Sequence, residues 1–240
     1  MFSQSAQWYD TLYSFKDYEE EAEKLKTLLG EVHPAAETVL DVACGTAEHD
    51  RYLARHYRVD GLDANPDLLA FAAQKNPAGD YVRGDMTDFT LKKQYDAIVC
   101  LFSSIGYVKT VDNVVKTLRC FHRHLNEGGV AVVEPWLTPH TWQPDGRAHM
   151  LTGETAVGKI CRMNLSQPAV HQDGQLVTVL NFHYLAGTVE GVTHFTERHE
   201  MGLFTVEEMK GAFRQAGFSV SYDEEGLTGR GLYVGRKPVR

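Results

Sequence analysis

The chain has 240 residues, of which 43% are hydrophobic, and a formal net charge of −8. This length suits one α/β domain with an insertion. The 24 basic residues form no dense run, which argues against a nucleic-acid-binding face but leaves open a local basic pocket for one phosphate group. Without a long apolar stretch or a secretory signal, and with four scattered cysteines, we expect a cytoplasmic protein with reduced thiols and no membrane partner.

The first part of the chain alternates predicted strands and helices. Residues 18–29 form a predicted helix that Gly30 is expected to end. Apolar runs predict strands at 38–42, 57–62, 81–83, 95–101 and 130–134, with helices at 47–56, 66–76 and 111–125 between them. This alternation predicts a doubly wound, mostly parallel α/β sheet.

The pattern changes after Trp136. Residues 159–166, 175–185 and 193–201 are predicted strands with no helix between them, which indicates an antiparallel β insertion beyond strand five. A capped helix at 205–216 and strands at 219–223 and 231–235 follow. We therefore expect a seven-stranded core formed by residues 1–136 and 200–240, with residues 137–199 as the insertion.

The segment LDVACGTAEHD (residues 40–50) follows the first predicted strand, at the edge where such sheets bind ligands. Gly45 lets the backbone turn tightly and lets a ligand approach closely. A dinucleotide loop has the pattern G-x-G-x-x-G for the pyrophosphate, whereas this loop has one glycine, and Asp41 at its entrance repels a diphosphate. The same carboxylate suits a cationic ligand with a free amino group, so the loop favours S-adenosylmethionine over NAD.

Acidic residues also end the next two predicted strands. Asp63 lies some twenty residues on, where a carboxylate accepts from both ribose hydroxyls. Asp85 is placed to accept from an adenine amino group, while Met86 packs on the ring. Taken singly, Asp41 is equally well a helix-capping acid, and Asp63 and Asp85 turn residues. The three acids together, each at the end of a strand, indicate the cofactor.

These motifs resemble a known family. LDVACGT, GLD, GDMTDF and the apolar strand at 95–101 are similar to the class I S-adenosylmethionine-dependent methyltransferases over residues 38–135. The resemblance implies S-adenosylmethionine as cofactor, and we assign Ala43, Ala64 and Leu101 to its site as well. The sequence departs from the family at Ala47, where glycine is usual. Alanine narrows the loop but keeps a small side chain, so we expect weaker or shifted cofactor binding and not its loss.

A more specific resemblance covers nearly the whole chain. The segments FSSIGYVKT (102–110), GDMTDF (84–89), VVEPW (132–136) and TGRGLYVG (228–235) are similar to the nucleotide-sugar N,N-dimethyltransferases, which methylate the amino group of dTDP-linked aminosugars. The resemblance implies the same reaction here. It also implies that Tyr9 packs near the methionine moiety and that Tyr18 reaches its carboxylate, although each tyrosine could instead pack on the sheet. The chain departs from the relatives at Leu137, where they have another aromatic residue, and in a shorter N-terminal arm.

Residues after strands four and five are candidates for the acceptor side. A deprotonated amine is already nucleophilic, so methyl transfer needs orientation and exclusion of water more than a strong base; we expect no metal. Tyr107 is placed to orient the amine or line the methyl pocket, or is a packed aromatic beside Ile105. Glu134 is a candidate to attract an ammonium and Trp136 to stack on a sugar or base. Alternatively, Glu134 is only an acid at the end of a strand, and Trp136 is an aromatic residue in the core of the insertion.

Two further residues are assigned to the substrate. Tyr13 belongs to an aromatic-rich N-terminal arm that we expect to fold over the cofactor. Arg230 lies between two glycines, where its guanidinium can bind a diphosphate bidentately. The alternative for Arg230 is a solvated turn residue paired with Glu224 or Glu225.

The sequence leaves other functions open. An O- or N-methyltransferase for another small metabolite and a non-catalytic S-adenosylmethionine-binding protein both fit the cofactor motifs. The expected partner is a small molecule, with no nucleic acid and no membrane, and a homodimer is left open.

Overall fold

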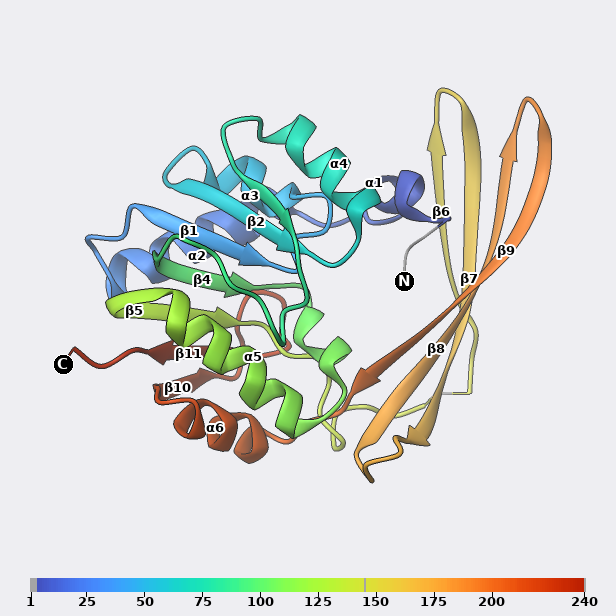
Figure 1. The fold of residues 1–240 in the computed structure, drawn as a ribbon. Helices are drawn as coiled ribbons and strands as arrows, with labels where there is room; N and C mark the ends of the chain where they lie inside the picture. The colour runs from blue at the N-terminus through green and yellow to red at the C-terminus, as the bar shows by residue number, and fades with distance from the viewer. Residues whose placement is uncertain (1–3, 145, 240) are drawn as a thin grey trace.

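A computed structural model describes residues 4–144 and 146–239, which form two sheets (Figure 1). The larger sheet has the strand order β10-β11-β5-β4-β1-β2-β3. Its pairs are parallel except where β11 meets β10 and β5. The predicted seven-stranded, mostly parallel sheet is therefore confirmed. Its strands are β1 (Thr38–Val42), β2 (Arg58–Asp63), β3 (Tyr81–Arg83), β4 (Tyr95–Cys100), β5 (Leu125–Val133), β10 (Ser219–Asp223) and β11 (Leu232–Arg236).

Helices cover both faces of this sheet, as the doubly wound pattern predicts. The helices of the described residues are η1 (Ala6–Trp8) and α1 (Tyr9–Leu12) in the N-terminal arm, η2 (Ser104–Val108) after β4, and α2 (Tyr18–Val32), α3 (Glu48–Leu53), α4 (Pro66–Lys75), α5 (Val111–His124) and α6 (Val206–Gln215) along the sheet. Side chains of β1 alternate between the faces: Val39 packs with α2 and α3, whereas Leu40 and Val42 pack with α5 and α6. Each such fully buried side chain stabilises the fold by roughly 1.5–3 kcal/mol.

Several helix boundaries differ from the prediction by one to three residues, two of them for a clear physical reason. Gly30 does not end α2, which continues to Val32, because glycine costs only about 1 kcal/mol inside a helix and Val32 packs against the core. The helix stops at His33, the residue before Pro34, where proline disfavours helical geometry. Helix α3 starts after Ala47 and not at it, because Ala47 is left-handed, with φ of 60°.

The second sheet is antiparallel, with the order β6-β7-β8-β9, and extends away from the first (Figure 1). Its strands are β6 (His149–Thr155), β7 (Gly158–Val170), β8 (Leu176–Thr188) and β9 (Gly191–Gly202). The predicted insertion is confirmed, but β6 was not predicted, since this edge strand is largely exposed and lacks an apolar alternation. The predicted boundary after residue 199 falls inside β9. The division into these two domains stays a prediction. Residues 1–3, 145 and 240 of the predicted domains lie outside the described residues.

The N-terminal arm packs on one face of the second sheet. Trp8 and Leu12 form a buried cluster with inward-facing residues of three strands: Ile160, Leu180, Phe182, Tyr184, Ala186 and Met201. Because strand side chains alternate in direction, β7, β8 and β9 each turn every second residue toward the arm and the larger sheet.

No helix in the described ranges is long and apolar enough to span a membrane. All four cysteines are free thiols.

Candidate active site

A cavity of about 1080 Å³ lies between the carboxyl ends of the parallel strands and the second sheet. A smaller cavity adjoins it and shares the walls formed by Tyr9, Ala43 and Gly45. The structure brings most of the predicted site residues to the larger cavity: Tyr9, Tyr13, Ala43, Gly45, Asp63, Ala64, Asp85, Met86, Tyr107, Trp136 and Arg230. Tyr18, Asp41 and Leu101 line the smaller one.

The loop after β1 is shaped for close approach of a ligand. Ala43 and Gly45 are left-handed, with φ of 64° and 57°. A Cβ at Gly45 would meet nothing within 4 Å, so open space lies above this residue. The Gly45 N–H donates to Asp63 Oδ2 over 2.9 Å, which ties the loop to the end of the neighbouring strand.

Asp63 is held rigidly at the end of β2. Besides the bond from Gly45, its Oδ1 accepts from the Asn65 N–H at 2.8 Å. Burial raises the pKa of this carboxyl although these amide bonds oppose the shift. At the end of β3, Asp85 Oδ1 accepts from the Thr87 N–H and hydroxyl, both at 2.8 Å. Asp85 is thus a turn residue that also lines the cavity.

Asp41 faces a second buried acid, Asp50, which the sequence did not single out. Both are almost fully buried, and each has an Oδ1 that lacks a donor. Burial and the neighbouring Asp50 raise the pKa of the Asp41 carboxyl, and burial raises the pKa of Asp50 to about 6. The Tyr81 hydroxyl donates to Asp50 Oδ2 at 2.9 Å. A proton shared by the two carboxyls would give both of the unpaired oxygens a partner, so we infer that the pair carries about one negative charge.

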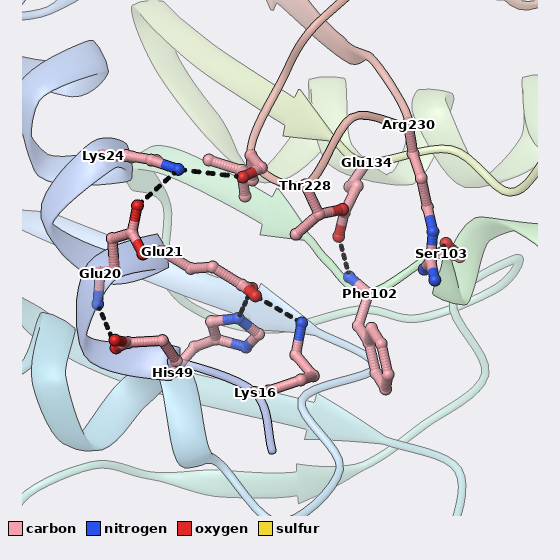
Figure 2. A network of polar contacts seen from close by, with 12 residues as sticks. Lys16, Glu20, Glu21, Lys24, His49, Phe102, Ser103, Glu134, Thr228 and Arg230 are labelled. Atoms are coloured by element: carbon pink, nitrogen blue, oxygen red, sulfur yellow. Dashed lines mark hydrogen bonds and ion pairs between the residues drawn. The ribbon is translucent and has the colours of Figure 1, made fainter. Parts of the chain in front are cut away.

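Glu21, Lys16 and His49 form a buried ionic group (Figure 2), and His49 lines the smaller cavity. Glu21 pairs with Lys16 at 2.6 Å and with His49 at 2.8 Å. The Lys16 ammonium lies 4.1 Å from the centre of the Phe102 ring. The Tyr18 ring contacts His49, and its hydroxyl is buried without a hydrogen-bond partner. The Tyr18 phenol and the Lys16 ammonium, together with the acidic pair of Asp41 and Asp50, suit a ligand that has both a carboxylate and an amino group.

These features fit S-adenosylmethionine. If the cofactor binds as the sequence predicts, the unpaired Tyr18 hydroxyl and the Lys16 ammonium would face its carboxylate, and Asp41 its amino group. The open space above Gly45 and the fixed carboxylate of Asp63 suit a ribose. The loop that carries Asp85 and Met86 provides an acceptor and an apolar wall for an adenine.

The opposite wall of the cavity carries aromatic and basic side chains. The Tyr107 hydroxyl lies 2.9 Å from His199 Nδ1. Arg162 of β7, buried, donates from its guanidinium to the Tyr13 hydroxyl at 2.7 Å and lies over the Phe182 ring. Burial raises the pKa of Tyr107 well above its usual range, so its hydroxyl stays protonated at neutral pH.

Arg230 also faces this cavity. Its guanidinium donates to Ser103 Oγ at 3.0 Å (Figure 2). The same guanidinium lies 5.3 Å from the Trp136 ring. Within the described residues no ion pair joins Arg230 to Glu224 or Glu225, so the interpretation as a solvated turn arginine is wrong. Trp136 lines the same wall, with its indole N–H buried and unpaired.

Glu134 corrects one prediction. It is fully buried and lines neither cavity. Its Oε2 accepts from the Phe102 N–H and its Oε1 from the Thr228 hydroxyl, each at 2.6 Å (Figure 2). Both oxygens are therefore engaged in holding the loop after β4 against the segment that carries Arg230. Glu134 does not meet an ammonium; it positions Phe102 and Arg230.

The site also contains residues that the sequence did not predict, among them Lys16, Asp50, Arg162 and His199. Asp50 lies in the segment LDVACGTAEHD and could have been noticed as a fourth acid near the edge that carries Asp41, Asp63 and Asp85. Lys16 could have been noticed beside the aromatic arm. Arg162 and His199 lie in long strands without a motif, and they reach the cavity region only through strand alternation.

Comparisons with known proteins agree with this geometry. Residues 39–129 match the family model described as "Methyltransferase domain". The chain is 38% identical to the dTDP-3-amino-3,6-dideoxy-alpha-D-glucopyranose N,N-dimethyltransferase of Streptomyces fradiae, over 96% of this chain and 89% of that protein. The crystal structure of Streptomyces venezuelae DesVI superposes with a TM-score of 0.88 at 34% identity, over 98% of this chain and 99% of that one. CalS10, an amino pentose methyltransferase from Micromonospora echinaspora whose structure is bound to S-adenosylmethionine, gives 0.82 at 31% identity, over 95% and 96%.

The fold, the acidic strand ends and the S-adenosylmethionine-compatible pocket are those of an S-adenosylmethionine-dependent methyltransferase. Within that class, the chain belongs to the family of the nucleotide-sugar N,N-dimethyltransferases.

Proposed function

We propose that the enzyme transfers methyl groups from S-adenosylmethionine to the amino group of a nucleotide-linked aminosugar. One observation carries the choice of acceptor. Arg162 and Arg230 both line the cavity, and within the described residues neither forms an ion pair with a carboxylate. In a chain with a net charge of −8, two guanidiniums that line one cavity without a carboxylate partner favour an anionic acceptor. A diphosphate accepts bidentate bonds from guanidinium, which lysine cannot copy.

The protein's own part in this reaction is to orient the acceptor. Bound S-adenosylmethionine supplies an electrophilic methyl group on a sulfonium centre. Aromatic side chains of the arm and of the cavity wall, Tyr9, Tyr13, Phe102 and Trp136, exclude water from the space between the two sides. In-line displacement needs the reacting atoms at roughly 3–3.5 Å, and the arginines fix the acceptor at its phosphates while Tyr107 meets its amine.

Product analysis by mass spectrometry tests this function. The wild-type enzyme with S-adenosylmethionine and a dTDP-linked aminosugar should give methylated nucleotide sugar and S-adenosylhomocysteine. Rate should rise with pH until the bound amine is deprotonated and then level off, because an ammonium has no lone pair. An enzyme that methylates a hydroxyl, or that accepts amines without phosphates equally well, would show that another small metabolite is the acceptor.

Tyr107→Phe sharpens the assay. Since the account gives Tyr107 an assisting role, turnover at high pH should fall moderately. A loss of roughly 10⁴-fold at every pH, the size seen when a member of a catalytic triad is removed, would show that Tyr107 is an essential base and that the account is wrong.

A further inference from the structure

A row of polar side chains on β7 lines the cavity. The cavity volume of about 1080 Å³ exceeds the roughly 300–1,000 Å³ that is usual for a pocket with one small ligand, so there is room for a second ligand beside the cofactor. Arg162, Asn164 and Ser166 all line it. Because side chains alternate along a strand, these three point to the same face of the sheet, about 7 Å apart from one to the next.

The row leads away from the N-terminal arm. At its near end, Ile160 packs with Trp8 of the arm, and the next inward-facing residue, Arg162, donates to the Tyr13 hydroxyl. Asn164 follows two positions later, on the side of Arg162 that is remote from the arm. A ligand that meets Arg162 and has one end at the arm therefore extends along the row with its other end.

Asn164 is a buried amide without a partner. The residue is 8% exposed and lines the cavity. Within the described part of the chain, its carboxamide makes no hydrogen bond with another group. A buried polar group without a hydrogen bond is unfavourable, and a ligand in the cavity would supply the missing bonds.

The surroundings of this amide are apolar and suit a flat ring. In the register of the second sheet, Asn164 pairs with Phe182, and Ser166 pairs with Leu180. Phe182 and Leu180 are buried and line the cavity, as does Trp142. An aromatic ring has apolar faces and a polar edge, so it fits a carboxamide that is flanked by apolar side chains.

The edge of a pyrimidine base complements a carboxamide. Asparagine presents an acceptor oxygen and a donor NH₂ side by side. Thymine presents its N3–H donor next to its O4 acceptor, so the two groups can form a pair of hydrogen bonds. In a nucleotide sugar the base and the aminosugar lie on opposite sides of the diphosphate. With the aminosugar toward the arm and the diphosphate at Arg162, the base lies toward Asn164.

We propose that Asn164 recognises the pyrimidine edge of the acceptor. Its NH₂ group donates to thymine O4 and its Oδ1 accepts from N3–H, while Phe182 and Leu180 cover the ring. The assignment rests on the proposed function, and it adds a residue that determines which base the nucleotide-linked substrate carries.

The test is the affinity of dTDP and of dCDP for wild type and Asn164→Asp, measured by calorimetry at pH 8 with S-adenosylhomocysteine bound. Both nucleotides carry the same diphosphate, so the ratio of their dissociation constants reports on the base alone. A carboxylate only accepts hydrogen bonds, so it repels thymine O4 but accepts from the cytosine N4 amino group. Asn164→Asp should shift the ratio toward dCDP by roughly 5- to 150-fold, the discrimination that a bidentate base contact provides.

Asn181→Asp is the matched control. It introduces the same carboxylate on β8, at a position that pairs with Leu165 and is not part of the cavity wall, and it should leave the ratio unchanged. A modified ligand tests wild type without a substitution. N3-methylated dTDP lacks the N3–H donor and should bind at least about fivefold more weakly than dTDP.

The two proposals fail in different ways. If Asn164→Asp keeps the wild-type ratio, or if N3-methylated dTDP binds wild type as tightly as dTDP, Asn164 does not recognise the base, although the proposed function stands. If wild type binds neither dTDP nor dCDP, the diphosphate site of the proposed function is contradicted, and the base assignment with it.

Discussion

The two walls of the cavity are built in different ways. The cofactor edge is formed by three short segments, after β1, β2 and β3, whose acids Asp63 and Asp85 accept from N–H groups two residues further on; one bond, from Gly45 to Asp63, joins the first segment to the second. The acceptor wall draws Tyr13 from the arm, Tyr107 from η2, Arg162 from β7 and Arg230 from the turn before β11. The first wall is a property of local sequence, whereas the second exists only once distant strands are in register. A substitution at the cofactor edge should therefore weaken binding of S-adenosylmethionine and leave KM for the acceptor unchanged. A substitution at the acceptor wall should raise KM for the acceptor and leave the affinity for S-adenosylmethionine unchanged.

The largest expected effect lies at the cofactor edge. Asp63→Ala removes the carboxylate assigned to the ribose hydroxyls, and each hydrogen bond to a charged group is worth about 1.5–3 kcal/mol. Loss of two such bonds, at least about 3 kcal/mol, predicts that the dissociation constant of S-adenosylmethionine rises at least about 100-fold in calorimetry. Asp60→Ala, on the same strand but bonded to Lys93 and Tyr95 outside the cavity, is the matched control. Unchanged affinity in Asp63→Ala would remove the ribose assignment.

The buried acid pair gives a stability prediction of intermediate size. Burial raises the folded-state pKa of Asp50 to about 6. The favourable contribution of the protonated group is complete below its unfolded pKa near 3.8 and is lost as pH rises through about 6. Asp50→Asn, which stays neutral, should raise the free energy of unfolding by roughly 1–3 kcal/mol at pH 8 and leave it unchanged at pH 4. Denaturant titrations of wild type and Asp50→Asn at the two pH values measure this free energy of unfolding. If Asp50→Asn is destabilised equally at both pH values, the shared proton is contradicted.

Ala47 gives the smallest effect. It is fully buried and lines neither cavity, so its methyl group does not narrow the ligand site as the sequence suggested. Glycine relieves a left-handed strain of about 1–2 kcal/mol, but it gives up a buried methyl worth about 0.8 kcal/mol and adds roughly 0.4–1 kcal/mol of chain entropy. Ala47→Gly should thus change stability by less than about 1 kcal/mol, and cofactor affinity by less than about twofold. A tenfold gain in calorimetric affinity would show that Ala47 acts on the site.

The difference between the cofactor edge and the acceptor wall also explains which site residues could be predicted from the sequence. Asp41, Gly45, Asp63 and Asp85 are predictable because each lies at or just beyond the end of a predicted strand, and the carboxyl ends of parallel strands meet at one edge. Glu134 satisfied the same rule, yet its side chain turns to Phe102 and Thr228, because position at a strand end does not fix the direction of a side chain.

His199 and Arg162 could not be predicted, for a different reason. Which face of an antiparallel strand is buried depends on register, and a shift by one residue would turn every side chain over. The pairing of Leu180 with His199 and of Tyr184 with Arg162 is set by contacts far apart in the chain.

The central claim is that the acceptor wall recognises the phosphates of a nucleotide-linked amine, and Arg230 tests it most directly. The measurement is KM of wild type, Arg230→Ala and Arg230→Lys for a dTDP-linked aminosugar and for the same aminosugar without phosphates. Exposed Arg119 on α5 gives the control variant Arg119→Ala. The account predicts a KM roughly 10- to 100-fold higher for the nucleotide sugar in Arg230→Ala, from the loss of about 1.5–3 kcal/mol, a smaller rise in Arg230→Lys, and little change for the free sugar or for S-adenosylmethionine affinity. If Arg230→Ala keeps the wild-type KM for every acceptor, the diphosphate site is contradicted, and with it the choice of a nucleotide-linked amine.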